Sequence, residues 1–86
     1  MQDDKGLYYY PNPQNKRVRV YVKEQGGEVF FRLWNQDDPE LFEDHDWVPW
    51  GAIKTAMGLF SGKGFDPAKV YDLSVARMIL KDAARS

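Results

Sequence analysis

The sequence predicts a small α+β domain: an antiparallel β-meander of two to three strands, packed on one face by two C-terminal helices. Three observations support this fold class. Apolar and polar residues alternate between residues 17 and 35, a Gly-Gly pair interrupts the alternation, and apolar residues recur every three or four positions after residue 47. A period of two is typical of half-buried strands, and spacings of three and four are typical of helices. At 86 residues, the chain is expected to form a single domain, 1–86.

The N-terminal part of the chain is expected to contain a tail and one short strand. Residues 1–6 are polar and end in Gly6, so we expect a frayed tail. Leu7–Tyr10 is predicted as a strand near 7–10, because aromatic side chains suit a pleated, half-buried surface. Pro11 and Pro13 end this strand, since neither can donate a ladder hydrogen bond. Whether this strand joins the main sheet is left open by the sequence.

The clearest local prediction is a β-hairpin with strands near 17–24 and 28–35. Each strand carries apolar residues at alternate positions, which places them on one face. The Gly26-Gly27 pair between the strands supplies the positive φ angles that a tight hairpin turn requires. The residues predicted to face the core are Val18, Val20, Val22, Val29, Phe31 and Leu33.

Two helices are predicted to follow, near 47–60 and near 66–84. For the first, Asp46 is the expected N-cap and Pro49 is tolerated in the first turn. For the second, Asp66-Pro67 gives the strongest helix-start signal in the chain, as N-cap and first residue. The predicted inward stripes are Trp50, Ile53, Met57 and Phe60 in the first helix, and Val70, Leu73, Ala76, Leu80 and Ala83 in the second, which Val75, Met78 and Ile79 widen.

The composition excludes several classes of protein. A chain that is 43% hydrophobic and 29% charged has the profile of a globular domain rather than a disordered one. The absence of cysteine excludes disulfides, thiolate metal sites and cysteine nucleophiles, and favours a reducing compartment. The first residues lack the basic and apolar pattern of a secretory signal, and no apolar run approaches the roughly 18 residues that span a bilayer. We therefore expect a cytoplasmic protein without membrane contact.

The face of the hairpin opposite the core is predicted to combine cations with large aromatic rings. This combination suits single-stranded nucleic acid, because cations meet phosphates while rings stack on bases. It is more typical of sheets that are stabilised by their own cation–π pairs or covered by a tail, and it also marks protein interfaces. A pI of about 5.7 argues against a nucleic-acid footprint. The candidate binding residues of this sheet face are Arg17, Arg19, Tyr21, Lys23, Phe30, Arg32 and Trp34.

Residues 37–46 form a predicted acidic loop without any Lys or Arg. Clustered carboxylates suit a hard cation, but their spacing matches no EF-hand, and zinc needs more than the single His45. His45 has no nucleophile or second acid beside it in chain order, so it gives no basis for general base catalysis. We expect no metal, no cofactor and no enzymatic activity, and a solvated loop that contacts a partner. Its acidic residues are Asp37, Asp38, Glu40, Glu43, Asp44 and Asp46.

The predicted function is a non-enzymatic protein-interaction module that uses the aromatic and cationic sheet face. The partner is another protein or a second copy, because the acidic loop and the cationic face can pair between two copies. The alternative is weak binding of single-stranded nucleic acid through the same face, with a steep salt dependence. A phosphate loop follows a strand, whereas a predicted helix precedes Ser61–Gly64, so we expect an inter-helix turn there, with Gly62 as the C′ residue of the first helix. Whether Trp47 and Trp50 are buried anchors or an exposed hot spot is open.

Overall fold

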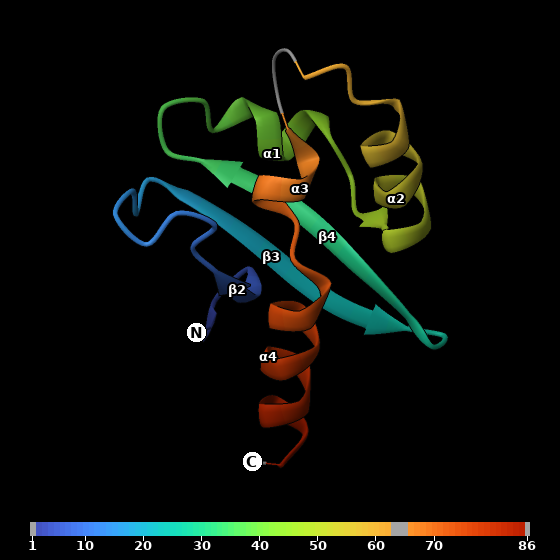
Figure 1. Cartoon of the computed structure of the whole chain (residues 1–86). Coiled ribbons are helices and arrows are strands. Elements are labelled where there is room, and N and C mark those ends of the chain that lie inside the picture. Colours follow the sequence, from blue (N-terminus) through green and yellow to red (C-terminus); the bar gives the residue numbers. More distant parts are fainter. Residues whose placement is uncertain (1, 63–65, 86) are drawn as a thin grey trace.

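The computed structural model describes residues 2–62 and 66–85, and it confirms the α+β class (Figure 1). Five antiparallel strands pair in chain order: β1 (Gln2–Asp3), β2 (Gly6–Tyr9), β3 (Val18–Gln25), β4 (Glu28–Asn35) and β5 (Val48–Pro49). The helices are α1 (Glu40–Asp44), α2 (Trp50–Leu59), α3 (Pro67–Val70) and α4 (Leu73–Arg85). No helix in these described ranges is long and apolar enough to cross a membrane.

The predicted hairpin is confirmed as the pair β3 and β4. Val22 lies opposite Phe31, and Val20 lies opposite Leu33, so the two apolar faces coincide as the alternation predicted. Gly26 and Gly27 have φ angles of 61° and 79°, which is the left-handed backbone that a tight hairpin turn requires. The turn therefore fixes the register that brings the core residues together.

The main core lies between this sheet face and the helices α2, α3 and α4, as predicted. Val20, Phe31 and Ala76 are fully buried at its centre. Met78 and Ala83 were wrongly predicted to face inward, because both are exposed on α4. The ring centroid of Phe31 lies 5.8 Å from that of Trp50 and 5.6 Å from that of Tyr71, so one aromatic side chain joins the sheet to two separate segments. Figure 1 shows α3 and α4 in front of the central strands, with α2 beside β4.

The N-terminal tail differs from the expectation of a frayed segment. Gln2 and Asp3 form strand β1, which pairs with Leu7 and Gly6 of β2. The backbone reverses at residues 4–5, and Gly6 at the start of β2 has a φ of 132°, which is open to glycine. The Asp3 carboxylate accepts a hydrogen bond from the Lys5 N–H at 2.8 Å across this turn. The tail is ordered because it gains both ladder hydrogen bonds and partners for its carboxylate.

The predicted helix near 47–60 begins later than expected, at Trp50. Val48–Pro49 instead forms the edge strand β5 against β4, which suits a proline because its missing N–H then faces away from the ladder. Asp46 is not an N-cap, and its carboxylate accepts from the Trp47 N–H at 2.7 Å. Trp47 and Trp50, both half-buried, consequently pack on opposite faces of the sheet.

The predicted helix near 66–84 is divided into α3 and α4. The Tyr9 hydroxyl lies at the break, where it donates to the Val70 carbonyl at 2.7 Å and accepts from the Asp72 N–H at 2.8 Å. The Asp72 carboxylate then accepts from the Val75 N–H at 3.1 Å, which is the arrangement of an N-cap for α4. A side chain from β2 therefore replaces the helical hydrogen bonds that the break removes.

The start of α3 is as predicted, because the Asp66 carboxylate accepts from the Ala68 N–H at 3.0 Å. Gly62, the expected C′ residue of the preceding helix, has a φ of 89°. It lies one position beyond C′, since α2 ends at Leu59. Residues 63–64 of the expected inter-helix turn lie outside the described residues.

Two glycine substitutions are expected to change stability in opposite directions. Gly27→Ala forces a Cβ into left-handed backbone, which costs about 1–2 kcal/mol. Gly58→Ala adds a Cβ within α2 that meets no atom within 4 Å, and alanine favours a helix by about 1 kcal/mol over glycine. Urea unfolding of both variants measures the two changes. A Gly27→Ala protein as stable as the parent contradicts the proposed turn geometry.

Candidate interaction surface

The aromatic and cationic sheet face is covered largely by the chain itself. The side chains of Tyr8 and Asp3 and helix α1 pack against it, and Tyr21 at its centre is fully buried. The ring centroid of Tyr21 lies 5.4 Å from that of Tyr8 and 5.6 Å from that of Phe42. Trp34 is half-buried against the same cluster. The fully buried ring of Tyr21 is not available to stack on a base.

Arg19 is held within this cluster by several partners at once. Its guanidinium carbon lies 4.9 Å from the ring centroid of Tyr8 and 4.8 Å from that of Trp34, so the cation is sandwiched between two rings. Its Nη1 lies 3.0 Å from the Asp3 carboxylate, which also accepts a hydrogen bond from the Tyr21 hydroxyl at 2.6 Å. Among the described residues, Arg19 Nε is the one buried side-chain nitrogen or oxygen without a hydrogen-bond partner.

These contacts shift the pKa values of both acids in the cluster. Burial, together with the hydrogen bond to Asp3, raises the pKa of Tyr21 to about 12. Burial alone pushes the pKa of Asp3 upward. The hydrogen bonds from Tyr21 and the Lys5 N–H, with the charge of Arg19, outweigh that effect and lower the pKa of Asp3. At neutral pH the cluster therefore holds one carboxylate, one guanidinium and one neutral phenol.

The other cations of the predicted site also have partners within the chain. The Arg32 guanidinium lies 3.7 Å above the ring centroid of Phe42 and donates to the carbonyl oxygens of Phe42 and His45. Lys23 lies 4.7 Å from the ring centroid of Trp47 and 5.5 Å from that of Phe30. The seven candidate residues do share one face, but their rings and charges are engaged with one another and with the covering segments.

The predicted acidic loop contains helix α1 and folds over the sheet face of its own chain. Phe42 anchors it there, and Arg17 pairs with Asp37 at 3.5 Å. The six predicted acidic residues are all exposed, and so is His45, whose Nδ1 lies 3.1 Å from the Leu41 carbonyl oxygen. Over residues 2–62 and 66–85, no three His, Asp or Glu side chains gather as ligands for a metal ion.

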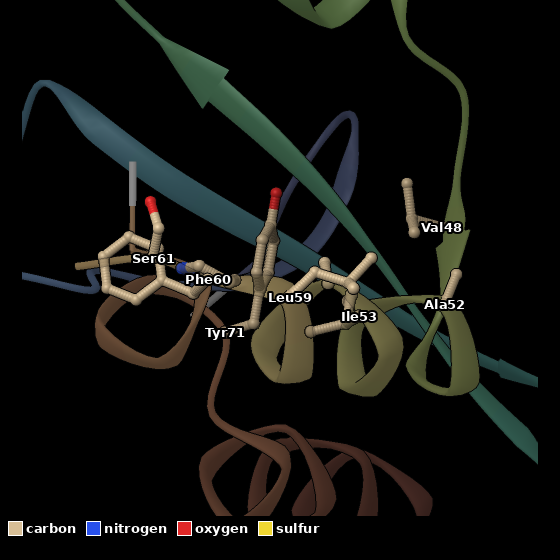
Figure 2. A pocket seen from close by; sticks show the side chains of 9 residues that line it. Val48, Ala52, Ile53, Leu59, Phe60, Ser61 and Tyr71 are labelled. Carbon is tan, nitrogen blue, oxygen red and sulfur yellow. The ribbon is translucent and has the colours of Figure 1, made fainter. Parts of the chain in front are cut away.

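An apolar groove that the sequence did not predict lies along α2 (Figure 2). Its main hollow has a volume of about 440 Å³, within the range of binding sites for small molecules and side chains. A second hollow of about 260 Å³ extends it toward α1 and shares Val48 and Tyr71 with the first. The main hollow is lined by Val48, Ala52, Ile53, Ala56, Leu59, Phe60, Ser61, Pro67 and Tyr71. The second adds Leu33, Leu41 and His45.

The groove is apolar because α2 carries apolar residues on its exposed side as well as its buried side. Ile53 faces the core, whereas Ala52, Ala56 and Leu59 form a second row along the groove, and Leu59 is 79% exposed. Lys54 is the one charged residue of the helix. A helix that is apolar on both sides usually buries both, and exposed apolar patches mark interaction sites. The near absence of charge between residues 50 and 59 is the sequence signal for this surface.

Comparison with models of protein families finds no match for this chain. Comparisons with curated proteins and with solved structures find no match either. The geometry of the groove is therefore the basis for a functional proposal.

Proposed function

We propose that this chain is a non-enzymatic protein-interaction module whose groove along α2 receives apolar side chains from a helix of a partner. The observation that carries the proposal is the exposed apolar row of Ala52, Ala56 and Leu59 beside an open hollow. An apolar trough of this kind is the receiving half of helix-in-groove recognition, in which anchors at spacings of three and four enter the trough.

The sheet face supports an interaction less well than the groove does. Its central ring, Tyr21, is fully buried, and Arg19 and Arg32 already have acceptors within the chain. The same observations weaken the nucleic-acid alternative, because stacking needs accessible rings and phosphate binding needs cations that are free to pair.

The acidic residues along one side of the groove favour a partner helix that carries basic residues. Leu41, His45 and Val48 line the α1 side, and the exposed carboxylates of Asp44 and Asp46 flank His45 in the chain. Charge complementarity of this kind steers association and sets specificity. The preferred partner segment is therefore an amphipathic helix with an apolar row flanked by Lys or Arg.

An NMR titration with a synthetic amphipathic helix of leucine and lysine tests this proposal. We expect amide shifts in β5, α2 and around Tyr71, with none centred on Tyr21. Leu59→Gln is expected to weaken binding by about tenfold, because it removes an apolar anchor contact. Thr55→Gln is the matched control, since Thr55 is exposed on the same helix but does not line the groove. Equal affinities for parent and Leu59→Gln, or shifts centred on the sheet face, contradict the groove as the site.

A further inference from the structure

We infer that the helix received by this groove is α4 of a second copy, which gives head-to-tail self-association; this rests on the proposed function. Two large apolar side chains are strongly exposed among the described residues, Leu59 at 79% and Met78 at 66%. Leu59 borders the groove, and Met78 lies on α4. An exposed apolar residue that complements a pocket elsewhere on the same surface produces a contact between different faces of successive copies.

The second half of α4 extends beyond the part of the helix that packs on the sheet. Ala76 is buried, Ile79 and Leu80 are half-buried, and residues 81–84 are all exposed. Figure 1 shows α4 running away from α2 and α3 toward the C-terminus. Met78 is not among the residues that line the groove of its own molecule, so the contact that we infer forms between two molecules.

The charges around Met78 complement those beside the groove. Arg77 and Lys81, together with one acid, Asp82, are exposed on the same stretch of α4, which leaves it a net positive charge, whereas the α1 side of the groove belongs to the acidic segment 37–46. Methionine suits an irregular apolar hollow because its unbranched thioether adapts its shape. The α4 segment thus offers one apolar anchor, rather than a full apolar row, with cations beside it.

One groove and one projecting helix per copy give an open chain or a ring. Because each contact is centred on one exposed side chain of α4, we expect its area to be below the roughly 800 Å² per partner of a stable interface. We therefore expect self-association that is weak, that grows with protein concentration, and that weakens with added salt as the charges are screened.

Sedimentation equilibrium of the full chain, at several protein concentrations and two salt concentrations, tests the inference. We expect the average mass to rise with concentration and to fall with salt. Leu59→Gln and Met78→Gln are each expected to lower the association constant by about tenfold. Thr55→Gln should associate like the parent. Circular dichroism of each variant confirms that it is folded.

Mixing the two defective variants gives the sharpest outcome. The Leu59→Gln copy retains an intact α4, and the Met78→Gln copy retains an intact groove, so the mixture is expected to regain one contact and to stop at dimers. A mixture that stays monomeric overturns the inference, as does association that Leu59→Gln abolishes but Met78→Gln leaves unchanged. If the parent itself is monomeric, the inference fails, while the leucine–lysine peptide titration still decides the proposed function independently.

Discussion

Tyr9→Phe is expected to lower the free energy of unfolding by about 1–3 kcal/mol, because one hydroxyl serves two backbone groups at the α3–α4 break. The substitution keeps the ring but leaves the Val70 carbonyl and the Asp72 N–H without this partner. Burial raises the pKa of the Tyr9 hydroxyl far above its ordinary value, so the proton donated to Val70 stays in place at neutral pH. For a domain of this size, each kcal/mol lowers Tm by roughly 4–8 °C.

Urea unfolding and thermal melting of Tyr9→Phe against the parent measure this loss. Tyr10→Phe is the matched control, because it removes the same oxygen from the neighbouring residue, whose side chain packs on the opposite sheet face. The control is expected to lose less than half as much stability. A Tyr9→Phe protein as stable as the control contradicts the bridging role of the hydroxyl.

Asp3→Ala is expected to be the second largest effect, with a loss of about 1–2 kcal/mol at pH 7, the scale of hydrogen bonds to a partly solvated charge. The pKa of Asp3 is lowered on folding, so its contribution is present above the ordinary value of 3.8 and is lost as pH falls through the folded value. Parent and Asp3→Ala are therefore expected to converge in stability under strongly acidic conditions.

Tyr21 is expected to make the stability of the fold depend on pH at the alkaline end of the range. Its pKa is raised to about 12 from an ordinary value of 10.0, so its contribution is complete below pH 10 and declines as pH rises toward 12. Urea unfolding at a series of pH values measures the loss of stability at acidic pH from Asp3 and the loss at alkaline pH from Tyr21.

Asp4→Ala is the control for Asp3→Ala, because the Asp4 side chain is 88% exposed and its contact with Lys5 is 3.9 Å long. Equal losses from Asp3→Ala and Asp4→Ala at pH 7 are incompatible with the buried cluster.

The hairpin and the helix start at Asp66 were predictable because each depends on neighbours in the sequence. Alternation sets the faces of β3 and β4, Gly26-Gly27 sets the turn, and Asp66 caps a helix within two residues of itself. The period of two also predicted that Arg19 and Tyr21 lie together on the sheet face opposite the main core. These features need no knowledge of the rest of the chain.

The missed features depend on contacts between distant residues. β1 contains only Gln2–Asp3, which has no strand propensity and is ordered through Tyr21 and Arg19. The break between α3 and α4 requires the hydroxyl of the distant residue Tyr9. The start of α4 did have a local sequence signal, because Asp72 is a typical N-cap residue and accepts from the Val75 N–H. The groove was not predicted because the sequence alone does not show whether an apolar row on a helix is buried by the same chain or left exposed on its surface.

The bridge from Tyr9 to Asp72 joins residues 63 positions apart, which has a consequence for biosynthesis. As the chain leaves the ribosome, β3 and β4 can pair early because their turn is local, but the core lacks Ala76 until α4 has been translated. The nascent hairpin exposes Phe31 and Val22 throughout that interval. We therefore expect chains that are truncated before α4 to bind chaperones and to be degraded by proteases. Chains that include α4 can bury these residues and are expected to escape both.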